Sequence, residues 1–188
     1  MPELNNQNFN HLKIHTQYSI CEGAIKIDNL KDFCKENKIP CLGLSDTSNL
    51  CGALEFAENI SKVGTQPIIG TQIYFRFEDT TGLLPLIALN ENGYKRIIEL
   101  SSRSYLENDP LSDPHLDIKE LLIDTKGVSL LSGTIQGLFG KLFEKGRLEE
   151  ISKLYKSLSS KFNDNFYLEI QRHGDQNEIA FEKFNLEQ

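Results

Sequence analysis

The sequence lacks the long apolar run that a membrane-spanning helix needs. No stretch of about 18 apolar residues occurs in the chain, so the sequence predicts no membrane helix and no membrane partner. The first six residues also lack a basic segment followed by an apolar one, which a secretory signal requires. We therefore expect a cytoplasmic protein.

Clustered positive charge is scarce as well. The chain has 20 Lys and Arg against 27 Asp and Glu, which gives a formal net charge of −7. The basic residues are scattered, and Lys95 with Arg96 comes nearest to a cluster. Because nucleic-acid backbones are bound mainly by grouped Lys and Arg, the sequence disfavours a surface devoted to DNA.

Paired cysteines and phosphate loops are missing too. Cys21, Cys34, Cys41 and Cys51 form no C-x-x-C pair, so we expect reduced, buried cysteines and not a zinc knuckle. The chain contains no G-x-x-x-x-G-K-[ST] loop and no closely spaced acidic pair of a polymerase palm. Nucleotide chemistry of those two kinds is therefore not predicted for this chain by itself.

The residues that are present indicate one α/β domain over residues 1–188. Hydrophobic residues make up 39% and charged residues 25%, as in an ordinary globular protein. Apolar periodicity predicts alternating elements and a mostly parallel sheet. The expected strands are 10–15, 41–45, 67–77, 83–89, 127–132 and 165–170, and the expected helices are 28–37, 50–62, 91–105, 117–123, 136–144, 147–160 and one from 176.

The segment that begins the first predicted strand resembles a metal-binding strand with one ligand missing. Alternation places His11, Lys13 and His15 on one face of it. Two histidines spaced by two residues can hold a metal ion, but a protonated lysine cannot. A cation thus stands where a ligand is expected.

Asp46 ends the predicted strand 41–45, which is where α/β folds place their ligands. Further polar residues follow other strands, and we expect one pocket to gather them: Glu22, Gln72, Glu169, Arg172 and His173. An Arg and a His beside a carboxylate can bind phosphate. The same residues can equally form an ordinary surface ion pair.

Several motifs occur together in a recognisable order. They are His11–Ser19 with Glu22-Gly23-Ala24, Leu44–Gly52, Pro67–Gly70, Leu86–Tyr94, Tyr105-Leu106, Leu130–Gly133, Tyr167–Glu169 and His173-Gly174. In this order they resemble the polymerase-and-histidinol-phosphatase (PHP) domain family, and within it the N-terminal domains of bacterial DNA polymerase III alpha subunits. The resemblance covers nearly the whole chain.

The resemblance implies a distorted barrel of about seven strands, a (β/α)7-like PHP barrel, with up to three metal ions at the carboxyl ends of the strands. It also implies that the closing strand lies beyond Gln188, so that the barrel in this chain is incomplete. Metal-binding members of the family have a histidine at the position of Lys13, a histidine at Thr47 and a glutamate at Gln72. A further histidine position corresponds here to Leu83.

The resemblance therefore implies a degenerate metal site. We call nine residues the predicted pocket: Lys13, His15, Glu22, Asp46, Thr47, Gln72, Glu169, Arg172 and His173. Thr and Gln offer only weak neutral oxygens to a metal, so we expect no catalytic cluster and at most one weakly held ion at His15, Glu22 and Asp46. We further expect Lys13 to pair with Asp46 or Glu22 in place of a metal, or else to be solvated.

The function that the resemblance implies is that of a fragment of a replicative, magnesium-using DNA-directed DNA polymerase. The fragment itself is expected to need no cofactor and to be an inactive scaffold. Its implied partners are the rest of the polymerase chain and the proofreading exonuclease subunit, with DNA reached only through the full-length protein. The alternative is a phosphoesterase or 3′–5′ exonuclease using zinc or manganese at His15, Glu22, Asp46 and His173.

Overall fold

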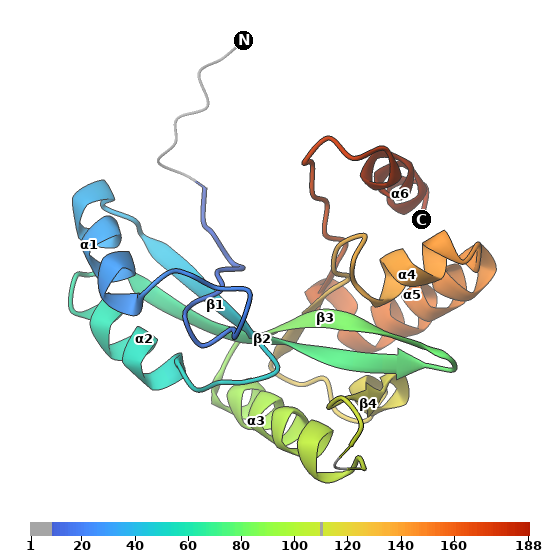
Figure 1. Cartoon of the computed structure of the whole chain (residues 1–188), viewed down its shortest axis with the longest axis horizontal. Helices are drawn as coiled ribbons and strands as arrows, with labels where there is room; N and C mark the ends of the chain where they lie inside the picture. The colour runs from blue at the N-terminus through green and yellow to red at the C-terminus, as the bar shows by residue number, and fades with distance from the viewer. Residues whose placement is uncertain (1–8, 110) are drawn as a thin grey trace. The chain divides into compact units, whose positions relative to one another are not determined.

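The computed structural model describes residues 9–109 and 111–188. It consists of two compact units, unit 1 up to Thr71 and unit 2 from Gln72 to Gln188, each of which we describe by itself (Figure 1). Helices and strands alternate in both units, which confirms the predicted α/β class. The assignment of residues 1–188 to one domain stays a prediction.

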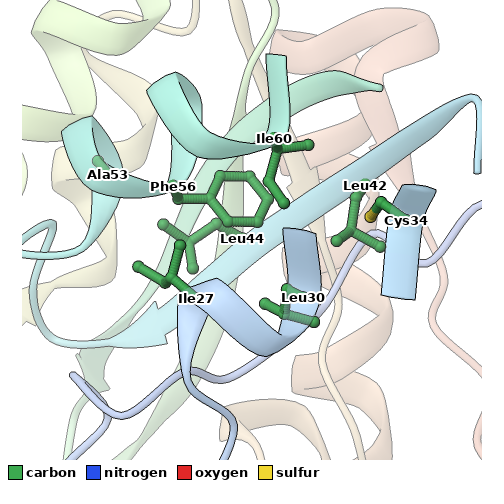
Figure 2. Packing of buried hydrophobic residues seen from close by; sticks show 8 residues of the cluster. All are labelled: Ile27, Leu30, Cys34, Leu42, Leu44, Ala53, Phe56 and Ile60. Carbon is green, nitrogen blue, oxygen red and sulfur yellow. The ribbon is translucent and has the colours of Figure 1, made fainter. Parts of the chain in front are cut away.

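Unit 1 is built from two helices, one whole strand and half of a second strand around a small apolar core. Its elements are α1 (Ile27–Asn37), β1 (Cys41–Thr47), α2 (Ala53–Ser61) and the first half of β2 (Gln66–Phe77), which neighbours β1. Figure 2 shows the core, in which the strand side chains Leu42 and Leu44 meet Phe56 of α2 and Leu30 of α1. These side chains are at most 5% exposed. Burial of this apolar surface, at roughly 25 cal/mol per Å², is the main force that holds the unit together.

The predicted strand 10–15 is wrong as a regular strand. Only a single parallel bridge joins Ile14 to Leu44, although the Gly43 N–H donates to the His11 carbonyl at 2.7 Å and the Ser45 N–H to the Ile14 carbonyl at 2.8 Å. The pairing stops at Thr16 because its N–H donates to a carboxylate and not to the next backbone carbonyl. The segment thus approaches β1 and then turns away.

Gly43 permits this close approach. A Cβ added there would lie 2.5 Å from the Leu12 carbonyl oxygen and 2.6 Å from its Cα, both backbone atoms. No side chain can occupy that space, so the glycine within β1 marks a site where another backbone segment crosses closely.

Unit 2 contains the second half of β2 and a larger set of elements. These are β3 (Thr80–Ala88), α3 (Glu91–Leu106), β4 (Leu116–Asp117), the 3₁₀ helix η2 (Ile118–Leu122), β5 (Val128–Leu131), α4 (Leu138–Glu144), α5 (Leu148–Phe162), η3 (Asn163–Asn165), β6 (Phe166–Tyr167) and α6 (Gln176–Leu186). The strand order is β4–β2–β3–β5–β6. This order has two ends, so the sheet in unit 2 is open.

The sheet of unit 2 contains parallel and antiparallel pairs of strands. β2 pairs with β4 and β5 pairs with β6 in parallel, whereas β3 and β5 are antiparallel. Helices α3 and α4 both pack on β3, and Figure 1 shows them on opposite sides of that strand. The apolar residues between these layers form the core of the unit, with Leu84, Leu86, Ile97, Leu100 and Phe139 nearly inaccessible.

A charged contact holds the turn between β2 and β3 to the link between α4 and α5. Arg147 donates from Nη1 to Asp79 Oδ1 at 2.8 Å, and its guanidinium also pairs with Glu78 and Glu150. The same guanidinium lies 5.3 Å from the ring centroid of Phe77. We call this set the Arg147 cluster. A cation that is both stacked on an aromatic ring and paired with carboxylates is well fixed.

Some expectations about individual segments were wrong. β4 lies outside every predicted strand, at the start of the predicted helix 117–123, and β6 is only two residues long in place of the predicted strand 165–170. The N–H of Glu169 donates to the Ser132 hydroxyl at 2.9 Å, which diverts the chain from further ladder bonds after β6. All four cysteines are free, and Cys34 is buried, but Cys21 and Cys51 are exposed and not buried as expected.

None of the described helices is long and apolar enough to cross a membrane.

Candidate functional site

Asp46, near the carboxyl end of β1, is fully buried, and both of its carboxylate oxygens accept hydrogen bonds. Its Oδ1 accepts from the Thr16 N–H at 2.6 Å and from the Ser19 hydroxyl at 2.7 Å. Its Oδ2 accepts from the Thr16 hydroxyl at 2.7 Å. Hydrogen bonds from an amide and two hydroxyls compensate the cost of burying the charge. We call Asp46, Thr16 and Ser19 the Asp46 clamp.

The clamp fixes a tight turn between residues 16 and 25. The N–H groups of Glu22 and Gly23 both donate to the Ser19 carbonyl, and a single parallel bridge joins Thr16 to Ile25. The Ser19 hydroxyl also accepts the N–H of Thr47 at 3.1 Å. These hydrogen bonds join the turn to itself and to β1.

Tyr18 and Asn49 extend this network to α2. The Tyr18 hydroxyl donates to Glu55 Oε2 at 2.7 Å, and this hydrogen bond to a carboxylate raises the pKa of Tyr18. The Asn49 amide donates to the carbonyls of Tyr18 and Thr47, both at 2.9 Å. The turn is thus attached to two elements of unit 1.

Glu22 and Thr47 meet directly. The Thr47 hydroxyl donates to Glu22 Oε2, so the residue that stands at a family ligand position binds a neighbouring carboxylate. Glu22 itself is exposed. This contact brings together two members of the predicted pocket.

His15 lies half-buried beside charged groups. Burial lowers the pKa of His15, and the positive charge of Lys13 lowers it further, while the charges of Glu22 and Asp46 oppose the change. Its Nδ1 atom is buried without a hydrogen-bond partner among the described residues. His15 is therefore favoured as the neutral imidazole. The pairing of Lys13 with Asp46 or Glu22 stays a prediction.

The metal cluster that the family resemblance implies does not fit the donors of unit 1. Both oxygens of Asp46 already accept hydrogen bonds, two of them on Oδ1, and Glu22 accepts one from Thr47. Across residues 9–109 and 111–188, no three His, Cys, Asp or Glu side chains are grouped so that they could hold an ion. A multinuclear site needs several free anionic or imidazole ligands for each ion.

The other four members of the predicted pocket belong to unit 2. Gln72 is buried in β2, with 6% of its surface exposed. Glu169 follows β6 and accepts from the Gln171 amide at 3.0 Å. Arg172 and His173 come next along the chain and are exposed.

Arg172 and His173 bind glutamates of α6. Arg172 donates from Nε and Nη2 to the two carboxylate oxygens of Glu182 at 3.0 and 2.5 Å. The His173 N–H and Nδ1 each bind one oxygen of Glu178 at 2.7 Å. These hydrogen bonds lower the pKa of both glutamates. The sequence left two alternatives for Arg172 and His173, a phosphate site or a surface ion pair. In the structure both residues contact glutamates of unit 2.

Sequence reasoning missed the residues that hold Asp46. Thr16 and Ser19 stand in the first motif, but neither was assigned a role. The available signal was two hydroxyl residues close to a turn and opposite a strand that ends in an aspartate, because hydroxyls are common donors to buried carboxylates. Which of them would reach Asp46 depends on turn geometry.

Similarity to known proteins agrees with the motifs. The DNA polymerase III alpha subunit of Caulobacter vibrioides (strain NA1000 / CB15N) is 37% identical over 191 residues, which cover 97% of this chain and 17% of that protein. The subunit of the same name from Vibrio cholerae serotype O1 is 31% identical over 182 residues, covering 95% of this chain and 16% of that protein. The chain thus spans less than a fifth of the length of these relatives.

A solved structure of an amidohydrolase from Chromobacterium violaceum aligns with 52% of this chain and 33% of its own chain, at 15% identity and a TM-score of 0.43. The PHP domain family matches residues 11–173. This range contains the quoted motifs from His11 through His173, which confirms the predicted resemblance. The chain belongs to the PHP domain family.

Proposed function

We propose that the chain is the N-terminal PHP module of a DNA polymerase III alpha subunit, a DNA-directed DNA polymerase of chromosomal replication that uses magnesium. Within that protein the module acts as a structural platform and not as a hydrolase. Support comes from relatives of that name that are 31–37% identical across 88–97% of the chain. Polymerisation belongs to parts of the longer protein outside this chain.

The observation that carries the platform role is the Asp46 clamp. A metal ion and hydrogen-bond donors compete for the same carboxylate lone pairs, and Asp46 receives three donors from Thr16 and Ser19. A carboxylate used in this way organises a turn and is not available to activate water. The residues around it, Thr47 and Lys13, are not ligands that would restore the site.

The partners we propose are the rest of the polymerase chain and the proofreading exonuclease subunit, with DNA reached only through the whole protein. A net charge of −7 favours protein partners over a phosphate backbone. Each unit also exposes large apolar side chains that a protein surface could cover, Ile20 and Leu54 in unit 1 and Ile179 in unit 2.

Metal analysis together with a hydrolysis assay tests the platform role. The 188-residue chain is purified after growth with zinc and manganese, its metal content is measured, and it is assayed on a phosphomonoester and on single-stranded DNA. We expect metal far below one ion per chain and no hydrolysis. Near-stoichiometric metal, with hydrolysis that is lost in His15→Gln, would overturn the proposal. His15 is the informative position because it lies outside the Asp46 clamp.

A binding experiment tests the proposed protein partner. The chain is mixed with the purified proofreading exonuclease subunit of the same source, and complex formation is followed by sedimentation velocity, with an unrelated acidic protein as control. Leu54→Asp and Ile179→Asp change an exposed apolar residue in unit 1 and in unit 2, respectively. We expect a complex that one of the two variants weakens. Sedimentation of both proteins as separate species would contradict the partner assignment.

A second candidate function is a phosphoesterase or 3′–5′ exonuclease with one zinc or manganese ion bound at His15, for which Glu22 and Asp46 would have to exchange their present hydrogen bonds for the metal. It is favoured by one observation, the buried Nδ1 of His15 that lacks a partner among the described residues. A neutral imidazole nitrogen is a common metal ligand. The metal and hydrolysis measurements above decide between the two functions.

A further inference from the structure

We draw no further inference here: the strongest candidate, the groove of unit 2 between α5 and β6 that Tyr155, Phe166 and Leu168 line, runs along the end strand of the open sheet, where the family resemblance already implies a closing strand, and nothing in the structure shows what else covers it.

Discussion

At the scale of single residues, Asp46 shows how the chain itself can satisfy a buried carboxylate. The resemblance to the family predicts a metal ligand at this position, and in the structure the carboxylate accepts three hydrogen bonds from Thr16 and Ser19. Donors from the chain itself do what a cation does for a buried charge, which is to compensate lost hydration. The hydrogen bonds of Asp46 thus give it a structural role in unit 1.

Replacement of Asp46 tests this interpretation. Asp46→Asn keeps the shape but replaces one acceptor oxygen by an N–H donor that faces the hydroxyls, so we expect a loss of about 3 kcal/mol in the free energy of unfolding. Urea unfolding followed by circular dichroism measures it. Asp28→Asn on the exposed face of α1 is the control and should change stability by about 0.5 kcal/mol or less. Similar stabilities of the two variants would contradict the clamp.

At the scale of elements, the Arg147 cluster joins the β2–β3 turn to the start of α5. Its guanidinium contacts Phe77, Asp79 and Glu150 at once, so it connects a hairpin to a helix that is 60 or more residues away along the chain. Lys145 adds a contact from its Nζ to the Thr80 hydroxyl at 2.6 Å.

We expect Arg147→Met to lower the thermal midpoint of unfolding clearly more than Lys95→Met does. Lys95 forms only an exposed helical pair with Glu91, and pairs of that kind contribute little. Differential scanning calorimetry at low and high salt gives the comparison. The difference between the variants should shrink in high salt, since ion pairs are screened, and a salt-independent difference would point to stacking on Phe77 alone.

The attachment of α6 should depend on pH. Hydrogen bonds from His173 and Arg172 lower the pKa of Glu178 and Glu182 below the ordinary value of 4.5. A carboxyl whose pKa is lowered in the folded state stabilises above its unfolded pKa, and the contribution disappears as the pH falls through the folded pKa. We therefore expect amide exchange in the first turn of α6 to speed up, after correction for intrinsic rates, between about pH 5 and about pH 3.

Hydrogen exchange followed by mass spectrometry measures this transition. Glu178→Gln with Glu182→Gln should exchange quickly at every pH, because neither side chain titrates. A pH-independent rate in the unmodified protein would show that the ion pairs do not hold the helix.

At the scale of the whole molecule, the acidic charge of the chain is the basis of the proposal that its partners are proteins and not DNA. The chain carries a net charge of −7 and belongs to the PHP domain family. Its relatives are polymerase subunits at least about six times its length, since it covers 16–17% of them. Contact with DNA is therefore more naturally a property of the longer protein.

We expect the isolated chain not to bind duplex DNA at physiological salt. Lys and Arg are outnumbered 20 to 27 by Asp and Glu, so few counterions would be released on binding. Fluorescence anisotropy with a labelled duplex, repeated at low salt, measures the affinity. Binding in the micromolar range that weakens steeply with salt would contradict this expectation and indicate a basic surface.

Much of the fold could be predicted from the sequence, because apolar periodicity determines which segments are helices and strands. The helices α3, α4 and α5 begin within two residues of their predicted starts. The early end of the segment predicted as strand 10–15 could not be foreseen from periodicity, because its backbone pairing ends where the Thr16 N–H binds a side chain. β4 was missed because two residues carry no detectable period.

The candidate site was predictable in position but not in its contacts. Asp46 lies near the carboxyl end of a buried strand as expected, and Thr47 and Glu22 meet. The donors to Asp46 and the glutamates on Arg172 and His173 depend on turn and helix placement, which composition and spacing do not determine. The role of Lys13 stays a prediction.

The Asp46 clamp also has a consequence for how unit 1 folds. Its hydrogen bonds join residues 27 and 30 positions apart, and the whole of α1 lies inside the loop that they close. Closing such a loop costs chain entropy that offsets much of what the three hydrogen bonds contribute, so packing of α1 against Leu42 and Leu44 should strengthen the clamp. Burial of α1 and order in the turn at residues 16–25 are therefore cooperative. A substitution that loosens the packing of α1 should also lower the stability of the turn, and the reverse should hold.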